Sequence, residues 1–263
     1  MLGAIIGDIV GSRFEFNNYR NKNFELITTK SDFTDDTIMT VAIMDILNND
    51  KINDKKYIID KIKHYGRKYP SSYGLSFSHW LFSNNSKPYN SFGNGAAMRV
   101  SPIGWLANNE REVKKWTYNV TEITHNHNEG LKGAQVTAMC VYYARIGKSK
   151  KFIKEYVEKY YKLDFDYETL RRTYRFNETC QETVPQAIYC FLISKDFEDC
   201  LRTSISIGGD SDTLAAISCS IAEAYYKHID NDLIKKIYEI LPQEFITVIK
   251  NFYVLYGKKL LTK

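Results

Sequence analysis

Residues 208–226 read Gly-Gly-Asp-Ser-Asp-Thr-Leu-Ala-Ala-Ile-Ser-Cys-Ser-Ile-Ala-Glu-Ala-Tyr-Tyr, an acidic cluster that runs directly into an apolar stretch. Over 214–226 the apolar residues recur at helical spacing and form a broad stripe suited to burial. A second stretch has the same design, because Thr34-Asp35-Asp36-Thr37 precedes an apolar stripe over 37–47. We predict a buried helix at each place, with an acidic cluster at its first turn.

Helix capping accounts for either acidic cluster alone, because Asp, Ser and Thr are favoured in the first turn of any helix. The paired glycines before Asp210 favour a further role, since they let backbone and side chains approach a ligand closely. Hard divalent cations prefer carboxylate and hydroxyl oxygens, and the two clusters together offer enough of them for two ions. We therefore expect the clusters to be two halves of one metal site.

Helical periodicity also dominates elsewhere, whereas alternating strand patterns are nearly absent. At the start of the chain Gly3, Gly7 and Gly11 recur every four residues, so a helix there would present a glycine face to a closely packed neighbour. Pro185 suits a first helical position. The fold is predicted to be all-α, with further helices at 55–68, 131–146, 150–161, 185–194, 197–207, 231–241 and 242–256.

Composition is typical of a globular protein, since 44% of the 263 residues are hydrophobic and 25% are charged. The net charge of +5 is too modest to indicate a nucleic-acid partner, although it would suit an anionic substrate. The apolar run at 2–10 is short, contains Asp8 and lacks a basic leader, and no other stretch approaches the length of a membrane span. We expect a cytoplasmic protein that does not enter the membrane.

Two loops carry further candidate residues. The stretch 91–99, Ser-Phe-Gly-Asn-Gly-Ala-Ala-Met-Arg, offers free backbone N–H groups for a phosphate, although a tight connection between helices explains it equally well. The stretch 124–130, Thr-His-Asn-His-Asn-Glu-Gly, is expected to be a capped loop facing a cleft. A zinc site is excluded, because the other histidines and the five cysteines supply no ligand pattern; the cysteines are interpreted as reduced and structural.

Five motifs, in this order along nearly the whole chain, resemble those of the ADP-ribosylglycohydrolase family, which includes dinitrogenase reductase-activating glycohydrolase. They lie at 3–8 with Glu15, 33–37, 93–99, 124–127 and 208–215. The resemblance implies a single domain over 1–263, a compact orthogonal helical bundle with a binuclear cleft for two Mg²⁺ or Mn²⁺ ions. It implies hydrolysis of the bond to the terminal ribose of ADP-ribose in an ADP-ribosylated protein or small-molecule conjugate. We expect a monomer. A nucleic-acid substrate stays open.

The resemblance also implies roles for individual residues. Metal ligands are expected at Thr34, Asp35, Asp36, Asp210, Asp212 and Thr213. Catalytic roles fall to Glu15, Asp35 and Asp36, with Glu15 the candidate proton-handling group in the attack of water on the anomeric carbon. Substrate contacts are expected from Gly93, Asn94, Gly95, Met98, His125 and His127, with Phe92 and Tyr89 as candidates for stacking on adenine.

The chain departs from the family pattern in two places. Asn128 stands where relatives commonly carry Pro, and Asn caps a helix well. Tyr73-Gly74-Leu75-Ser76 stands where some relatives carry an acidic residue, which leaves open whether Glu15 is the sole base. Two other functions suit the same residues: an ADP-ribose-binding relative without catalysis, and a metal-dependent nucleotide phosphohydrolase. The leaving group also stays open among an arginine or serine side chain, a base, and a small alcohol or phosphate.

Overall fold

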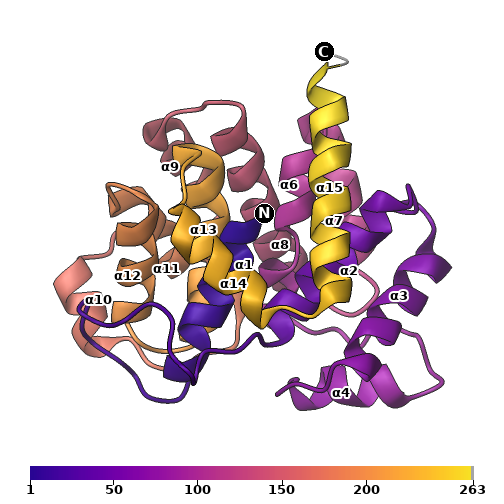
Figure 1. Ribbon diagram of the computed structural model, residues 1–263, viewed down its shortest axis with the longest axis horizontal. Helices are drawn as coiled ribbons and strands as arrows, with labels where there is room; N and C mark the ends of the chain where they lie inside the picture. The colour runs from indigo at the N-terminus through magenta and orange to yellow at the C-terminus, as the bar shows by residue number, and fades with distance from the viewer. Residues whose placement is uncertain (262–263) are drawn as a thin grey trace.

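The computed structural model describes residues 1–261, and within that range the regular structure is helical apart from one isolated β-bridge between Gly93 and Thr179. The all-α prediction is confirmed. Two helices lie at the centre, α1 (Leu2–Gly11) and α13 (Ser211–Tyr226), with the others arranged around them (Figure 1). All of α1 is buried, as is α13 over 211–224, which is the environment expected for helices that are apolar on most sides.

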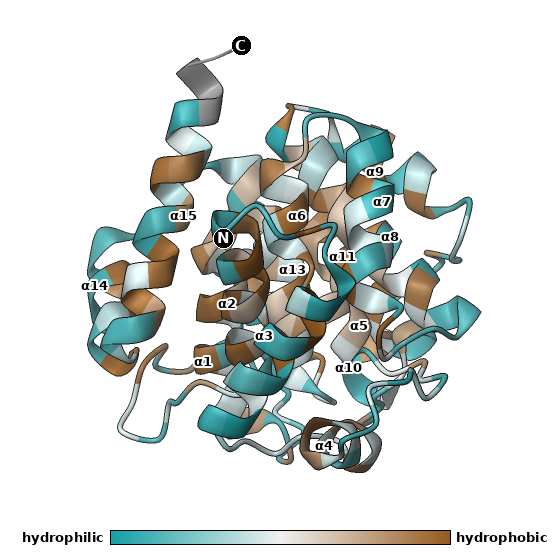
Figure 2. Cartoon of the chain, turned by 90° about the vertical axis from the view of Figure 1, so that its right-hand side faces the viewer, coloured by the Kyte–Doolittle hydropathy of each residue, from teal (hydrophilic) through white to brown (hydrophobic). Residues whose placement is uncertain are grey.

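The surrounding helices follow the predicted segments closely, and several short ones add to them. Figure 2 shows that apolar residues gather on the inner helices α1, α2 and α13, whereas hydrophilic residues cover the outer faces. No helix in the described range is long and apolar enough to cross a membrane. The remaining elements are η1 (Ser12–Phe14), α2 (Asp35–Asn48), α3 (Lys55–Lys68), α4 (Leu75–Phe82), α5 (Gly95–Met98), α6 (Ser101–Leu106), α7 (Glu110–Thr121), α8 (Asn128–Arg145), α9 (Lys150–Val157), α10 (Tyr167–Thr173), α11 (Cys180–Ile193), α12 (Phe197–Ser206), α14 (Asn231–Ile240) and α15 (Gln243–Leu261).

The prediction that Pro185 opens a helix is wrong. Helix α11 begins five residues earlier, at Cys180, and Pro185 lies inside it, where it cannot donate to the carbonyl of Gln181. The early start has a tertiary cause: the Cys180 N–H donates to the Phe92 carbonyl over 2.9 Å, beside the bridge between Gly93 and Thr179. This contact attaches the start of α11 to the glycine loop.

The predicted glycine face is confirmed, and α13 is the helix that packs against it. A Cβ added to Gly7 would lie 2.3 Å from the carbonyl oxygen of Ala215, and one added to Gly11 would lie 2.6 Å from the Cα of Asp212. Real Cβ atoms do not come so close, so only glycine permits this backbone-to-backbone contact. The contact brings Asp8 of α1 beside the first turn of α13.

Candidate metal centre and cleft

The two acidic clusters meet in the folded chain. Thr213 Oγ1 donates a hydrogen bond of 3.1 Å to Asp36 Oδ2 across 177 positions of sequence. Carboxylate oxygens of Asp8, Asp36 and Asp212 lie within 4.8 Å of one another, and those of Glu15, Asp210 and Asp212 form a second such group. Because Asp212 belongs to both groups, the arrangement could hold two neighbouring cations.

Without a cation, burial and mutual repulsion disfavour the ionised form of these carboxylates. Burial, with the charges of neighbouring carboxylates, raises the pKa of Asp35 to about 8 and those of Asp36 and Asp212 well above their ordinary values. Asp36 Oδ1 is buried and has no hydrogen-bond partner. Hard divalent cations fit this set, since its oxygens are their preferred ligands and their charge would offset the repulsion.

Asp8 is a member of the centre that sequence reasoning did not assign. Its Oδ2 accepts hydrogen bonds from the N–H groups of Thr34, at 2.9 Å, and Thr37, at 3.0 Å, while Oδ1 accepts from Thr34 Oγ1 at 2.6 Å. Thr34 is the N-cap of α2 but makes no capping bond with its own side chain. Asp8 therefore caps α2 from α1. The sequence feature that could have indicated this role is the position of Asp8, a single carboxylate inside the otherwise apolar run at 2–10.

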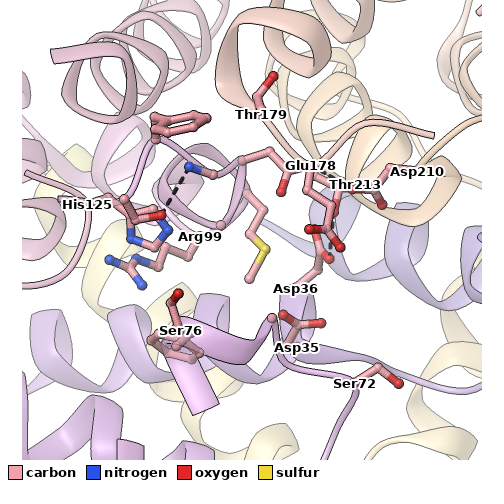
Figure 3. Close-up of a pocket in the computed structure, with 18 of the residues that line it drawn as sticks. Asp35, Asp36, Ser72, Ser76, Arg99, His125, Glu178, Thr179, Asp210 and Thr213 are labelled. Carbon is pink, nitrogen blue, oxygen red and sulfur yellow. Dashed lines mark hydrogen bonds between the residues drawn. The ribbon is translucent and has the colours of Figure 1, made fainter. Parts of the chain in front are cut away.

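The centre lies in a cleft of about 500 Å³ (Figure 3). Of the residues predicted for the site, all but Thr34 and His127 line this cleft. The hydroxyl of Thr34 points instead to Asp8. His127 accepts a hydrogen bond from the Glu129 N–H at the start of α8, and its ring lies 5.3 Å from that of Phe92. Of the two predicted histidines, only His125 faces the cleft.

The glycine loop is held by its neighbours. The Gly93 N–H donates to Ser91 Oγ over 3.1 Å and the Asn94 N–H to the Glu178 carbonyl over 2.7 Å, so the free N–H groups expected at these two residues are already used. The Asn94 side chain donates to Asp210 Oδ2 over 2.6 Å. Asn94 therefore orients one of the candidate ligands from the opposite wall.

The ring of His125 lies against the glycine loop. The Thr124 hydroxyl accepts a hydrogen bond from Arg99 over 2.9 Å and shares a second hydrogen bond of 2.7 Å with His125 Nδ1. A Cβ added to Gly95 would lie 3.3 Å from His125 Nε2. Burial and then the charge of Arg99 hold the pKa of His125 well below its ordinary range, so the ring is uncharged at neutral pH.

The wall formed by residues 72–77 carries no carboxylate side chain. Ser72, Gly74 and Ser76 line the cleft there and bring no carboxylate. A carboxylate enters from another element: Glu178, in the segment before α11, lines the cleft near Glu15. No motif in the sequence marked Glu178, because its place depends on the attachment of α11 to the glycine loop.

Fold and site together define an all-helical protein whose carboxylates gather in one cleft and could hold divalent cations. Comparison with known proteins shows the family to which this chain belongs. Residues 1–259 match the model of the family described as ADP-ribosylglycohydrolase. The chain belongs to the ADP-ribosylglycohydrolase family and is an enzyme that hydrolyses glycosyl bonds, as the resemblance of its motifs implied.

Curated relatives agree with this membership, and a solved structure shares the fold. The chain is 26% identical to ADP-ribosylhydrolase ARH3 of Homo sapiens, with 86% of this chain and 84% of the relative covered. It is 25% identical to the ADP-ribosyl-[dinitrogen reductase] glycohydrolase of Rhodospirillum rubrum over 51% of this chain and 46% of the relative. A solved chain titled "ADP-ribosylglycohydrolase-related protein complex" shares the fold with a TM-score of 0.75 at 21% identity, covering 97% of this chain and 95% of that one.

Proposed function

We propose that the protein is a metal-dependent hydrolase that cleaves the glycosidic bond at the terminal ribose of an ADP-ribosylated substrate and releases ADP-ribose. The observation that carries the proposal is the pair of carboxylate groups that share Asp212 beside a cleft of about 500 Å³. A cleft of this size suits a ligand as large as a nucleotide diphosphate sugar. The family match over 1–259 supports treating the whole chain as one domain.

The proposed cofactor is a pair of Mg²⁺ ions, with Mn²⁺ as a substitute. Asp36 and Asp212 would hold one ion, while Glu15, Asp210 and the shared Asp212 would hold the other. Asp35, Thr34 and Thr213 are the remaining candidate ligands. Bound ions of this kind would polarise ribose hydroxyls and make a neighbouring water easier to deprotonate.

The chain's own residues divide the other tasks. Glu15 is the proposed group that accepts a proton from water. In the centre without cations, burial, followed by the charges of Asp210 and Asp8, raises the pKa of Glu15 to about 7. The carboxylates would stabilise the positive charge of an oxocarbenium-like transition state. On the opposite wall, the uncharged ring of His125 and the loop with Gly95 and Met98 are proposed to bind substrate, with Phe92 as a stacking surface.

Product analysis tests this function against its rivals. ADP-ribosylated protein and free ADP-ribose are incubated with the enzyme and Mg²⁺ or Mn²⁺, and products are identified by mass. We expect metal-dependent release of intact ADP-ribose from the protein. Release of AMP, by cleavage of the diphosphate, would favour the phosphohydrolase. Binding of ADP-ribose without turnover of any conjugate would favour the inactive relative.

A further inference from the structure

Arg20 is a half-buried cation in the loop at 15–24 that follows η1, here called the Glu15 loop, and it does not line the cleft. Its guanidinium donates to the carbonyls of Arg171 and Tyr174 at the end of α10, and to the carbonyl of Ile207, the C-cap of α12. Figure 1 shows the Glu15 loop passing beside α10. Helix C-termini carry unpaired carbonyls and a partial negative charge, so this one cation caps two helices.

The turn that begins the second acidic cluster lies against Arg20. Gly208 and Gly209, which connect α12 to α13, have φ values of +73° and +76°, in the left-handed region that favours glycine. A Cβ added to Gly208 would lie 2.9 Å from Cζ of Arg20, and one added to Gly209 would lie 2.3 Å from Cε1 of Tyr174. The two glycines are therefore packed against the guanidinium and the Tyr174 ring.

Asn18 bonds the Glu15 loop directly to this turn. Its Oδ1 accepts a hydrogen bond of 3.2 Å from the Gly209 N–H and another of 3.2 Å from the Arg20 guanidinium. Asn18 has a φ of +43°, a conformation that Asn adopts more readily than most residues. The carbonyl of Arg20 also accepts from the Arg171 guanidinium over 2.9 Å. The position of the loop and the position of the turn therefore depend on each other.

The loop and the turn each carry a member of one carboxylate group. Glu15 opens the loop and Asp210 directly follows the turn; with Asp212 they form the second of the two groups that could hold a cation, here called the second cation position. Asp210 is the N-cap of α13, but its side chain makes no capping bond. The direction of its carboxylate depends instead on the turn before it and on its hydrogen bond from Asn94.

We propose that Arg20 is the positioning residue of the second cation position and that it acts through the backbone. Its planar fork of donors joins the ends of α10 and α12 to the Glu15 loop, which sets where Glu15 lies relative to Asp210. The other carboxylate group is held differently, because Asp8 bonds to the first turn of α2. This inference rests on the proposed function, since it requires a centre that binds two cations.

Titration calorimetry of the full-length protein with Mn²⁺ tests the proposal in Arg20→Ala and Asn18→Gly. The glycine variant keeps a residue that accepts positive φ and removes the Oδ1 acceptor of the turn. Arg202→Ala is the matched control. The Arg202 guanidinium also donates to carbonyls of the Glu15 loop, at Lys22 and Phe24 over 2.8 Å each, but it does so beyond the residues that contact the turn.

We expect the unchanged protein to bind two Mn²⁺ ions. Arg20→Ala and Asn18→Gly should each weaken the binding of one ion by roughly ten- to a hundredfold and leave the affinity for the other ion unchanged, because only the second cation position depends on the turn. Arg202→Ala should lower the melting temperature through its lost loop contacts and still bind both ions with unchanged affinity.

The outcomes separate this inference from the function beneath it. Unchanged affinity for both ions in the two variants, or the same loss in Arg202→Ala, would overturn the positioning role while leaving the two-cation centre intact. No Mn²⁺ bound by the unchanged protein would contradict the metal-dependent function, and the positioning role with it. If Arg20→Ala does not fold, Asn18→Gly decides the question, because it leaves the guanidinium and its three carbonyl partners in place.

Discussion

Asp212 illustrates how much one side chain can control at this centre. It is buried, its carboxylate belongs to both candidate cation groups, and its Oδ1 accepts the N–H of Thr213, which fixes its direction. Other members of the set contribute to one group only. A change at Asp212 should therefore affect both cation positions together.

Asp212→Asn should remove at least about 100-fold of the ADP-ribose release and reduce the number of Mn²⁺ ions bound, because an amide is a poor substitute for a shared carboxylate ligand. Titration calorimetry measures the stoichiometry, and product release measures turnover. Asp232→Asn, in the first turn of α14 and exposed, is the control and should leave both unchanged. Undiminished release by the Asp212 variant would refute its place in the centre.

Most of the candidate ligands lie in the first turns of helices. The contacts that fix the position of each helix therefore also fix the positions of these carboxylates. Helix α2 presents Asp35 and Asp36 from its first turn, and its N-terminus is capped by Asp8 from another helix. In the proposed metal centre, capping and metal binding would therefore be linked, because the carboxylate that accepts from the α2 backbone also holds the turn that carries the candidate ligands Asp35 and Asp36.

Asp8→Asn keeps one oxygen and loses the other, so part of the α2 cap is lost. We expect a loss of about 1 kcal/mol of stability, as for other capping residues, together with weaker Mn²⁺ binding. Asp54→Ala is the control, because it removes the oxygen that caps α3 by accepting from the Tyr57 N–H, at a residue that does not line the cleft. The control should lose stability and keep its Mn²⁺ affinity. Equal affinities in the two variants would show that Asp8 serves only the helix.

The close packing of α1 on α13 gives a second prediction about helices. Gly7→Ala places a methyl group 2.3 Å from the Ala215 carbonyl, so the helices must separate, at a cost of about 1–3 kcal/mol. Gly257→Ala, in α15, meets no atom within 4 Å and should stabilise the protein by about 0.5–1 kcal/mol through helix propensity. Urea denaturation compares the two. If Gly7→Ala left the free energy of unfolding unchanged, α1 and α13 would not be packed as closely as described.

For the molecule as a whole, we expect the carboxylate centre to link the free energy of unfolding to pH and to divalent cations. The folded-state pKa values of Asp8, Glu15 and Asp35, about 6, 7 and 8, lie above their ordinary values of 3.8, 4.5 and 3.8. The folded chain therefore binds more protons than the unfolded chain between about pH 4 and pH 8, and its stability falls as the pH rises through this window.

We expect the metal-free protein in EDTA to show this loss in thermal denaturation scans from pH 4 to pH 8. Mg²⁺ should restore the melting temperature most strongly near pH 8, because the ionised carboxylates then bind it. In the Asp212→Asn variant the recovery should be much smaller. A melting temperature that rises with pH in EDTA would contradict the predicted direction.

The amino-acid sequence by itself determined the features that depend on residues close together along the chain. Helical periodicity indicated α2, α3, α12 and α13, the glycine spacing indicated a close helix contact, and acidic first turns indicated a metal site. The misplaced start of α11 marks the limit of such reasoning, since a contact with the glycine loop, distant in sequence, sets that boundary.

Tertiary structure alone decided which side chains meet. It placed Asp8 at the N-terminus of α2 and made Asp212 common to two carboxylate groups. It also turned His125 rather than His127 to the cleft, and it brought Glu178, which belongs to no motif, into the cleft lining. The physical reason is that burial, hydrogen bonding and charge repulsion act through space. Residues far apart in the chain share these interactions only after α1 and α13 have packed, and the chemistry of the acidic clusters depends on that contact.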